Sequence, residues 1–400
     1  MKETLTNLFF AIQEAWMQSI YIQIVTIGLL SCLLIQWIYY LGYFTRIFRY
    51  ARKCRKGKVS YNNNFPAVSV IVCARNESIN LEAYLPLLLQ QDYPEYEVIV
   101  VNDRSTDDTE DILKLLSYKY PHLKTTFIPD RARFIDSKKM AVTLGIKSAS
   151  NDVLLFTDAD CYPRSKDWLT LMARNFTDTT QMVLGYGAYQ YKKGFLNFLI
   201  RFDTLTIGMQ YLNLALGRRA YMGVGRNMGY RRRFFEQTSG FTKHLNLQSG
   251  DDDLFVNENS RKGNTRIEID PQSVTLSNPE ESFELWLLQK SRHLSTSSHY
   301  RFSNKLFIGI ELLSRAGFYA LLIATACLAY PWGLAVASLA FLLRNIVQIT
   351  VINATAKQLG EKKFYFGVTF LDILFPLISL FLHVKRHFGP NMVYKWKLDF

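Results

Sequence analysis

Two carboxylates near the middle of the chain have the spacing of a metal and phosphate site. Asp158 and Asp160 stand two residues apart in the run FTDADCYP, directly after the apolar run VLLFT. One side chain of such a pair can hold a hard divalent cation while the other meets a sugar or ribose hydroxyl. Mg²⁺ or Mn²⁺ held in this way completes its shell with substrate phosphates and water, and it neutralises charge on a departing diphosphate.

Three adjacent carboxylates form a second acidic group, in which Asp251, Asp252 and Asp253 follow Gly250. Because they repel one another, at least one is expected to ionise with difficulty or to face a cation. One of them is a candidate general base that removes a proton from an acceptor hydroxyl. The run also fits a helix N-terminus capped by Ser249 or Asp251, which would hold a carboxylate in a fixed place.

Side chains that could bind phosphate lie in three further runs. In QKSRH, Arg292 could clamp a diphosphate, and Gln289 lies three residues earlier on about the same helix face. A basic helix end in contact with lipid is the alternative. Lys138 and Lys139 open the helix-like run KKMAVTLGIKSA, a position suited to phosphate contact as well as to solvent. The glycine-rich run at 221–233 could form an acceptor or diphosphate loop, although it lacks a dinucleotide-binding fingerprint.

Short β-branched runs followed by amphipathic segments predict a parallel α/β sheet in the middle of the chain. The runs at 68–73, 97–101 and 153–157 are nearly continuous in apolar residues, as expected for strands buried on both faces. A helix is expected to begin near Ser105, whose hydroxyl could cap it. Ligands bind at the carboxyl ends of such strands. Polar residues follow each of the three strands: Ala74, Arg75, Asn76 and Glu77; Asn102, Asp103 and Arg104; and Asp158 and Asp160.

Apolar segments at both ends of the chain predict membrane helices. Residues 21–41 form an apolar run of about the 20 residues that a bilayer crossing needs. A cleaved signal peptide is the alternative for this run. Three more apolar stretches lie at 306–330, 333–352 and 365–384. The first two should form a tight hairpin, whereas the third is left open as a crossing, a re-entrant segment or an interfacial helix.

The charge distribution predicts the orientation in the membrane. A basic cluster follows the first apolar run and belongs on the cytoplasmic side, which places the N-terminus outside. Its members are Arg46, Arg49, Arg52, Lys53, Arg55, Lys56 and Lys58. The net charge is +13, but attraction to anionic lipid explains this cluster more simply than nucleic acid does, and no nucleic-acid fold signature accompanies it.

Cysteines and intramembrane charges give two further expectations. The five cysteines have no paired spacing, which argues against a disulfide framework or a zinc site and fits a reduced cytosolic domain. Glu311 and Arg315, four residues apart, should share one helix face inside a bundle. Arg344 and Asp372 also need partners or water.

Five motifs occur in the order and approximate spacing of family 2 inverting glycosyltransferases with a GT-A fold: VSVIVCARNE, VIVVNDRSTDDT, FTDADCYP, GDDDL and QKSRH. The chain resembles membrane-integrated members such as the cellulose, hyaluronan and poly-N-acetylglucosamine synthases. The resemblance implies a Rossmann-like α/β fold with a mixed, mainly parallel sheet flanked by helices, and transmembrane helices at both ends. The expected division is a membrane segment at 1–45, a cytoplasmic catalytic domain at 46–304 and a C-terminal membrane domain at 305–400.

The resemblance also implies roles for the residues that bind the donor. Asp103 and the loop of Ala74, Arg75 and Glu77 would contact the nucleoside. Lys138 would lie near the diphosphate, as would Gln289 and Arg292. Asp158 and Asp160 would be the nucleotide-sugar and metal aspartates, with Asp160 the direct ligand of Mg²⁺ or Mn²⁺.

Two motifs depart from the family pattern. Asp251 would be the general base, but Gly250 stands where the motif usually has glutamate, so Asp252 competes for that role. The family's Gln-x-x-Arg-Trp motif ends here in His293. Loss of the tryptophan beside the acceptor sugar puts processive polymerisation in doubt.

The resulting hypothesis is an inverting hexosyltransferase in the cytoplasmic (inner) membrane, with several crossings and a cytoplasmic catalytic domain. It would move sugar from a nucleotide diphospho-sugar, a UDP-sugar in the first place, to a lipid-linked or growing polysaccharide acceptor. A processive synthase that translocates its product, an inactive membrane scaffold and a transporter are the alternatives. Because few crossings make a poor pore, a translocating synthase would pair with itself or with another protein, so a homo-oligomer is one expected assembly.

Overall fold

The computed structural model describes residues 20–129, 138–245, 247 and 249–388, and it divides into two compact units. The larger unit contains Arg46–Arg301 and Thr355–Lys363, together with the described residues from Phe381 onward. The smaller unit contains the described part of Met1–Thr45, with Phe302–Ala354 and Phe364–Leu380.

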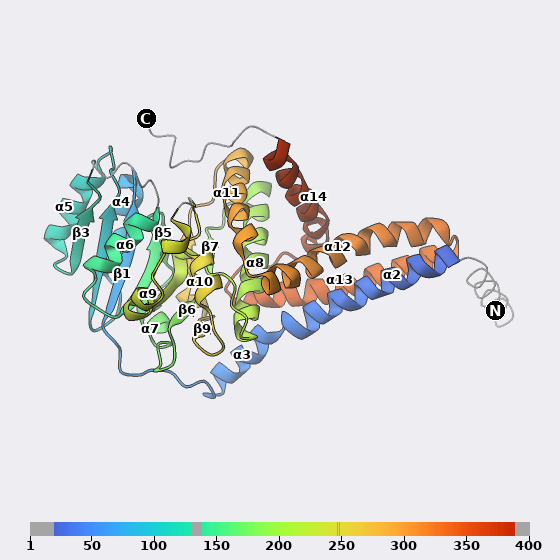
Figure 1. Ribbon diagram of the computed structural model, residues 1–400, viewed down its shortest axis with the longest axis horizontal. Helices are drawn as coiled ribbons and strands as arrows, with labels where there is room; N and C mark the ends of the chain where they lie inside the picture. The colour runs from blue at the N-terminus through green and yellow to red at the C-terminus, as the bar shows by residue number, and fades with distance from the viewer. Residues whose placement is uncertain (1–19, 130–137, 246, 248, 389–400) are drawn as a thin grey trace. The chain divides into compact units, whose positions relative to one another are not determined.

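The larger unit is built around a seven-stranded sheet with the order β3-β2-β1-β4-β8-β6-β9 (Figure 1). The strands from β3 to β4 are parallel, β8 is antiparallel to both β4 and β6, and β9 is parallel to β6. A small second sheet has the order β5-β10-β7. The predicted mixed, mainly parallel sheet is thus confirmed. The strands are β1 Val68–Ala74, β2 Tyr96–Asn102, β3 Leu123–Phe127, β4 Val153–Asp158, β5 Cys161–Pro163, β6 Met182–Leu184, β7 Gly187–Tyr189, β8 Met228–Arg231, β9 Thr265–Ile267 and β10 Thr275–Ser277.

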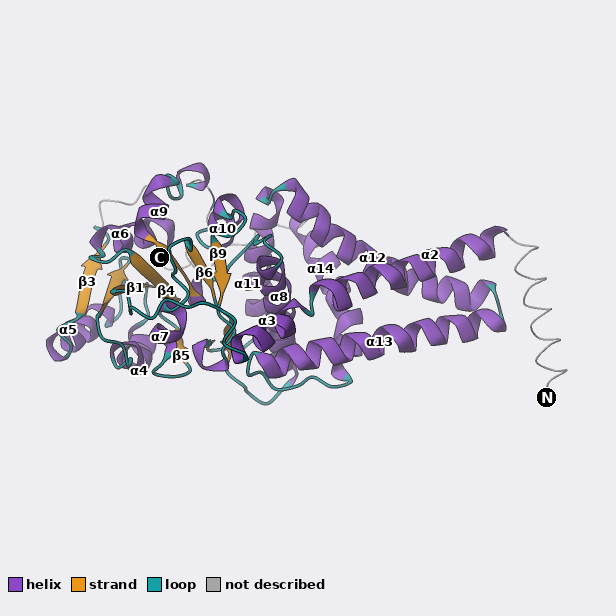
Figure 2. Cartoon of the chain, turned by 90° about the horizontal axis from the view of Figure 1, so that it is seen from below, coloured by secondary structure: helices purple, strands orange, loops and turns teal. Residues whose placement is uncertain are grey.

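Helices of the larger unit cover both faces of this sheet, as Figure 2 shows in purple. The α-helices are α3 Arg46–Arg55, α4 Ser78–Leu89, α5 Thr109–Lys119, α6 Lys138–Ser148, α7 Trp168–Ala173, α8 Phe195–Leu216, α9 Arg232–Gln237, α10 Asp253–Asn259 and α11 Phe283–Thr296. Short 3-10 helices lie at Gly225–Asn227, Thr242–His244, Pro271–Ser273 and Ser297–His299.

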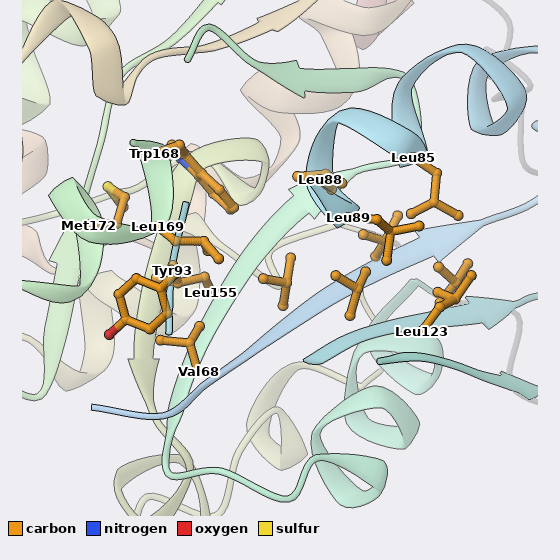
Figure 3. Packing of buried hydrophobic residues seen from close by; sticks show 14 of the residues in the cluster. Val68, Leu85, Leu88, Leu89, Tyr93, Leu123, Leu155, Trp168, Leu169 and Met172 are labelled. Carbon is orange, nitrogen blue, oxygen red and sulfur yellow. The ribbon is translucent and has the colours of Figure 1, made fainter. Parts of the chain in front are cut away.

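Alternation along the strands divides the apolar core between the two faces. Val70 and Val72 of β1 belong to the cluster formed with α4, α5 and α7, part of which is drawn in Figure 3. Ile71 and Cys73 point to the other face, where α6 packs. Helix α6 approaches β1 closely because residue 145 is glycine: a Cβ there would lie 2.6 Å from Ile71 Cγ2.

The strand order places the carboxyl ends of β1, β2 and β4 at one edge of the sheet. The first strand of the sheet, β1, lies in its interior. The chain then adds β2 and β3 on one side of β1 and crosses back to place β4 on the other side. The register pairs Ala74 with Asn102 and Cys73 with Asp158, so these three strands end side by side. In open α/β sheets, ligands bind at such a point of reversal.

The strand predictions are confirmed to within one residue at either end, but the expected helix start near Ser105 is wrong. Helix α5 begins at Thr109. Ser105 Oγ instead accepts a hydrogen bond of 3.0 Å from the backbone N–H of Asn76, in the loop after β1. Asp107 makes a similar link, because its Oδ2 accepts from the backbone N–H of Ser78 at 3.0 Å. The polar residues after β2 therefore join two loops before the helix starts.

Among the described residues, three helical segments are long and apolar enough to cross a membrane: Ile20–Arg55, Phe302–Leu328 and Trp332–Gln358. The first contains α2 Ile20–Trp37, a π-helical stretch at Ile38–Tyr43, and α3; the others are α12 and α13. Only three residues separate α12 from α13, as the predicted hairpin requires. The apolar part of α14 Gly367–Phe388, at Gly367–Leu382, is shorter. Helices α2, α12 and α13 run side by side (Figure 1 and Figure 2) around Leu29, Phe318 and Ala340.

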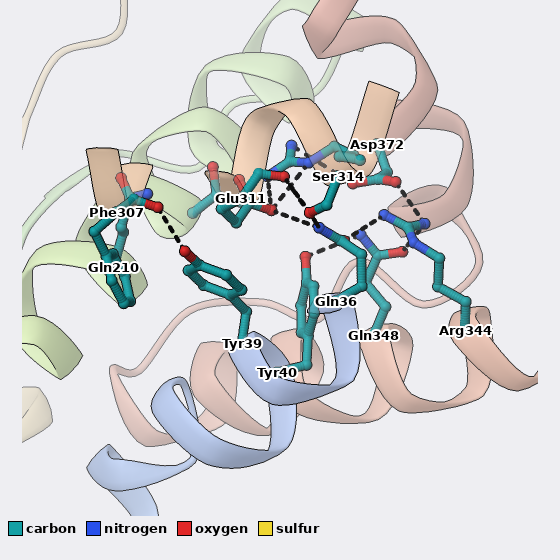
Figure 4. Close-up of polar contacts among 12 residues, drawn as sticks. Gln36, Tyr39, Tyr40, Gln210, Phe307, Glu311, Ser314, Arg344, Gln348 and Asp372 are labelled. Atoms are coloured by element: carbon teal, nitrogen blue, oxygen red, sulfur yellow. Dashed lines mark hydrogen bonds and ion pairs between the residues drawn. The ribbon is translucent and has the colours of Figure 1, made fainter. Parts of the chain in front are cut away.

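A buried polar network joins the four helices of the smaller unit (Figure 4). Arg344 Nη1 lies 2.8 Å from Asp372 Oδ2, and Arg344 Nη2 donates to Gln36 Oε1 at 3.0 Å. The predicted pair of Glu311 and Arg315 is confirmed, with 2.6 Å between Oε1 and Nη2. The two arginines and two carboxylates cancel in charge, which makes them tolerable in an apolar bundle.

Candidate active site

A small pocket, open to solvent, lies where β1 and β4 end, and it is called the cavity below. Its lining includes Cys73 of β1, Thr157 and Asp158 of β4, and Lys138 at the start of α6. Gly225, Asp251 and Asp252 line it from two later segments. Strand ends, a helix N-terminus and the acidic run at 251–253 therefore meet at one place, although they lie far apart in the sequence.

Lys138 stands between the two acidic groups. Its Nζ donates to Asp158 Oδ1 at 2.5 Å and lies 3.8 Å from Asp251 Oδ2. Burial favours the neutral form of Lys138, but the two aspartates outweigh it and raise the pKa of the ammonium well above its usual value. Burial also works against the charge of Asp158, yet Lys138 holds the pKa of that carboxyl below its usual value. Arg226 and Arg292 act in the same direction on Asp158.

The three adjacent aspartates make different contacts. Asp252 is engaged by backbone, because its Oδ2 accepts from Gly225 N–H at 2.8 Å and its Oδ1 from Asp253 N–H at 2.7 Å. Asp253 is nearly inaccessible and accepts from the hydroxyls of Thr296 and Tyr300. Asp252 is thus the cap of α10, rather than Ser249 or Asp251. Asp251 is the member of the run that faces Lys138.

Burial raises the pKa of Asp251, and the neighbouring Asp252 and Asp158 raise it further, whereas Lys138 lowers it. The net result is a carboxyl group that takes up a proton more readily than an exposed aspartate does. A general base works best when its pKa approaches the working pH, so this shift suits proton abstraction. Gly250 has φ +103°, a conformation that favours glycine, which explains why a larger residue does not stand before Asp251.

Asp160 lies beside Asp158 and is held by two donors. The hydroxyl of Ser277 on β10 donates to Asp160 Oδ2 at 3.0 Å, and the Cys161 thiol donates to Oδ1 at 3.2 Å. Ligand atoms of Asp158, Asp160 and Cys161 all lie within 4.8 Å of one another. Burial raises the pKa of the Cys161 thiol well above its usual value, so the carboxylates are the available ligands. Two carboxylates open to phosphate oxygens fit Mg²⁺ or Mn²⁺.

The loops after β1 and β2 form a second part of the site. Asp103 is fully buried; its Oδ1 accepts from Arg104 Nε at 2.9 Å, and its backbone N–H donates to Ala74 O at 2.8 Å. No described residue donates a hydrogen bond to Asp103 Oδ2. A buried carboxylate oxygen without a donor is costly unless a ligand supplies one. Arg75 and Glu77 lie on the same β1 loop, where Glu77 N–H donates to Thr109 Oγ1 at 3.0 Å.

Gln289 and Arg292 both lie on α11, as predicted, but their contacts differ. Gln289 Oε1 accepts from the Tyr189 hydroxyl at 3.1 Å, and its Nε2 donates to Glu280 at 3.1 Å. These contacts place Gln289 beside β7 rather than in the lining of the cavity. Arg292 acts on Asp158 through its charge. The cavity thus collects Lys138, Asp158, Asp251 and Asp252, whereas the other predicted residues lie around it.

Two residues with potential roles, Ser277 and Arg226, escaped the sequence analysis, and the prediction that Lys139 contacts phosphate or solvent is wrong. Ser277, which orients Asp160, stands in an unremarkable run and becomes visible only through the pairing of β5 with β10. Arg226 belongs to the glycine-rich run at 221–233, where its guanidinium stacks 4.5 Å from the Tyr189 ring. Lys139 is fully buried next to Lys138. Only the paired lysines and the glycine-rich run offered a signal.

Comparisons with known proteins show which proteins the chain is similar to. Residues 69–239 match the family described as glycosyl transferase family 2. Glycosyltransferase AglE of Haloferax volcanii is 30% identical over 192 residues, which cover 47% of this chain and 60% of AglE. Probable glycosyltransferase YdaM of Bacillus subtilis is 26% identical over 237 residues, covering 57% of this chain and 54% of YdaM. The chain therefore spans somewhat more than half the length of these relatives.

A solved structure has the same fold. Mannosyltransferase PcManGT from Pyrobaculum calidifontis, in complex with GDP-Man and Mn²⁺, aligns with a TM-score of 0.52 and 19% identity. The alignment covers 91% of this chain and all of that one. The match at residues 69–239 and the shared fold identify a glycosyltransferase with a GT-A fold, as the motifs predicted.

Proposed function

We propose that the chain is an inverting, hexosyl-transferring glycosyltransferase that moves sugar from a nucleotide diphospho-sugar to an acceptor hydroxyl. The observation that carries the proposal is the placement of Asp251. Its carboxylate faces Lys138 in the cavity, while Asp252 and Asp253 accept hydrogen bonds from the surrounding fold. Burial raises the pKa of all three carboxyl groups, so the contacts, and not the pKa, distinguish Asp251. This arrangement supports Asp251, and not Asp252, as the general base.

In the proposed reaction the donor lies along the carboxyl edge of β1, β2 and β4. The nucleoside contacts Asp103 and the β1 loop of Ala74, Arg75 and Glu77. The diphosphate lies toward Lys138 and within the field of Arg292, and Gln289 stands on the same helix as Arg292. As the acceptor oxygen bonds to the anomeric carbon, Asp251 takes its proton and the bond to the diphosphate breaks, so one displacement inverts the anomer. Cations already placed around the leaving diphosphate stabilise its charge.

The donor set at Asp158 and Asp160 supports a divalent metal in this reaction. Asp160 is the proposed direct ligand, because Ser277 and Cys161 fix the orientation of its carboxylate. Mg²⁺ or Mn²⁺, when bound, would neutralise negative charge on the departing diphosphate. Asp158, which is already paired with Lys138, would contribute to the metal site and to donor binding.

We propose a lipid-linked or growing polysaccharide as the acceptor, delivered at the cytoplasmic face of the inner membrane. Three membrane-length helices in the same chain support an acceptor that arrives from the bilayer. A UDP-sugar is the first donor to consider. The fold relative binds GDP-Man, which makes GDP-mannose the second. A processive synthase is less well supported, because His293 replaces the motif's tryptophan.

A donor screen tests the proposed function. Detergent-purified protein is incubated with Mg²⁺ or Mn²⁺, a panel of UDP- and GDP-sugars, and lipid-linked or oligosaccharide acceptors. We expect release of nucleoside diphosphate with one donor and the appearance of a product whose anomeric configuration is inverted. Product length separates single transfer from processive synthesis. Failure to release nucleotide from any donor would favour the inactive scaffold.

The proposed membrane arrangement has the N-terminus outside, segments 1–45 and 305–400 in or at the membrane, and 46–304 in the cytoplasm. Residues 355–363, which form the end of α13 and the residues that follow it, belong to the same compact unit as the catalytic domain, which supports a return of the chain to that side. In a cysteine-free background, Tyr330→Cys between α12 and α13 should react with an impermeant maleimide in intact cells. Lys193→Cys in the catalytic domain should react only after permeabilisation. The reverse pattern contradicts this orientation.

Substitution of Asp103 should weaken nucleotide binding. Its Oδ2 is buried and lacks a donor among the described residues, so a nucleoside N–H or hydroxyl can satisfy it. Because a hydrogen bond to a charged group contributes about 1.5–3 kcal/mol, Asp103→Ala should raise the dissociation constant of the nucleotide roughly 10- to 100-fold. Calorimetric titration measures the change. Glu110→Ala, at an exposed site on α5, is the control and should bind normally. An unchanged constant in the Asp103 variant removes this residue from the nucleoside site.

A further inference from the structure

Lys139, the second residue of α6, makes an unusual set of contacts. Its side chain is fully buried, and its Nζ donates to three backbone carbonyls: His244 O at 2.6 Å, Leu247 O at 2.7 Å and Ser249 O at 2.8 Å. An ammonium group has three N–H donors and no acceptor. All three donors of Lys139 therefore bind backbone carbonyls between His244 and Ser249, a segment called the 244–249 stretch below.

Burying the ammonium group of Lys139 costs free energy, so packing alone does not explain a lysine at this position. A buried charge is unfavourable unless it is paired and hydrogen-bonded, and an apolar side chain of similar size often serves stability equally well. Burial lowers the pKa of Lys139, whereas the charges of Asp251, Asp253 and Asp252 raise it. The lysine thus contributes two things that an apolar residue would not, namely donors for three carbonyls and a positive charge near three aspartates.

The 244–249 stretch, which Lys139 contacts, ends two residues before Asp251, the proposed general base. Ser249 is followed by Gly250, whose φ of +103° turns the chain, and then by Asp251. His244 is also held laterally, because its Nε2 lies 2.5 Å from Glu258 Oε1. Lys139 therefore fixes the chain at its last residue before the turn that delivers Asp251 to the cavity.

The adjacent lysines thus act on different parts of the site: one on Asp158, the other on the chain before Asp251. Lys138 reaches into the cavity and binds Asp158, whereas Lys139 holds the stretch before Asp251. We infer that Lys139 is a positioning residue for the transfer reaction: it sets the place and the charge environment of Asp251 relative to the donor held at Asp158 and Lys138. This inference rests on the proposed function, because it presumes that Asp251 is the base.

The test compares Lys139→Met, which removes donors and charge, with Lys139→Gln, which keeps two N–H donors without the charge. Lys139→Arg keeps the charge on a group of different shape. Because a displacement of about 1 Å in a catalytic group can cost roughly 100-fold in rate, we expect kcat of Lys139→Met to fall about 10- to 100-fold. The nucleotide dissociation constant should stay within about threefold, since the donor contacts are retained. Lys147→Met, at an exposed site on the same helix, is the matched control and should behave as the wild type.

Two further measurements distinguish positioning from a general loss of stability. Removal of a nearby cation raises the pKa of a carboxyl group, so the acidic limb of the pH–rate profile should move to higher pH in Lys139→Met and Lys139→Gln but not in Lys139→Arg. Trypsin should also cut faster after the exposed Lys243 in Lys139→Met, because the following stretch has lost its anchor. This second measurement does not depend on enzymatic activity.

The possible outcomes separate the inference from the function on which it rests. Wild-type kcat, pH profile and trypsin resistance in both Lys139→Met and Lys139→Gln overturn the positioning role. So does an equal loss of kcat and nucleotide affinity together with an unchanged pH profile. A wild-type protein that transfers sugar from no donor contradicts the proposed function instead, and in that case faster cleavage after Lys243 still supports Lys139 as the anchor of the stretch.

Discussion

Asp251→Asn is expected to abolish sugar transfer while leaving nucleotide binding intact. The amide cannot accept the acceptor proton, and removal of a general base costs about 100- to 10,000-fold in rate. Asparagine has nearly the same shape, so the cavity and its contact with Lys138 should persist. Initial rates with saturating donor give the change in kcat, and calorimetric titration gives the nucleotide dissociation constant, which should stay within about threefold of the wild type.

Two other aspartates provide the controls for this result. Asp111→Asn, at an exposed site on α5, should leave rate and stability unchanged. Asp252→Asn should act mainly on the fold, because Asp252 accepts hydrogen bonds from the backbone of Gly225 and Asp253. Its expected signature is a lower unfolding temperature, because the amide keeps one acceptor oxygen and leaves one of these two backbone N–H groups without its partner, at a cost of about 1–3 kcal/mol. Near-normal turnover in Asp251→Asn, together with inactive but stable Asp252→Asn, would transfer the base role to Asp252.

The pH dependence of the wild-type enzyme is expected to follow from the titration of Asp251. Burial, Asp252 and Asp158 raise the pKa of Asp251. A base must be unprotonated to act, so kcat/KM should fall as the pH drops through this raised pKa, at a higher pH than an ordinary aspartate would give. Asp251→Asn should lose this acidic limb in whatever residual rate remains.

Much of the fold could be predicted because burial on both faces leaves a strong pattern in the sequence. The strands at 68–74, 96–102 and 153–158 are nearly pure apolar runs, and their polar ends are the residues that meet at the sheet edge. Strand β3 was missed because its residues Lys124 to Thr126 are polar, as suits an edge strand with one partner. The start of α5 was misplaced because Ser105 bonds to another loop rather than to its own helix.

The candidate site was less completely predictable, since several of its contacts join distant segments. Asp251 and Asp252 are equivalent in the sequence, and only the path of the backbone at Gly225 engages Asp252 and leaves Asp251 facing Lys138. Ser277 reaches Asp160 through a pairing of two three-residue strands that no local pattern announces. The motifs indicate which residue types lie in the site. The role of each side chain depends on its contacts, and some of these join residues more than 100 positions apart.

Asp160→Ala is expected to remove the metal dependence of donor binding. This change deletes one of the two carboxylates at the proposed metal site and leaves Asp158 paired with Lys138. Nucleotide-sugar binding should then respond little to Mg²⁺ or Mn²⁺, and transfer should fall at least about 100-fold, because electrostatic stabilisation of the leaving group is lost. Titration of the nucleotide with and without metal measures the first effect, and initial rates measure the second.

A milder variant shows whether Asp160 acts as a ligand or only as a packing residue. Ser277→Ala keeps the carboxylate but removes the hydroxyl that orients Asp160 Oδ2. Loss of such an orienting partner weakens metal affinity about 10- to 100-fold, so higher metal concentrations should restore transfer in Ser277→Ala. They should not restore it in Asp160→Ala. If Asp160→Ala binds the nucleotide with the metal dependence of the wild type, the metal is held elsewhere, and Asp160 with its two donors serves the fold instead.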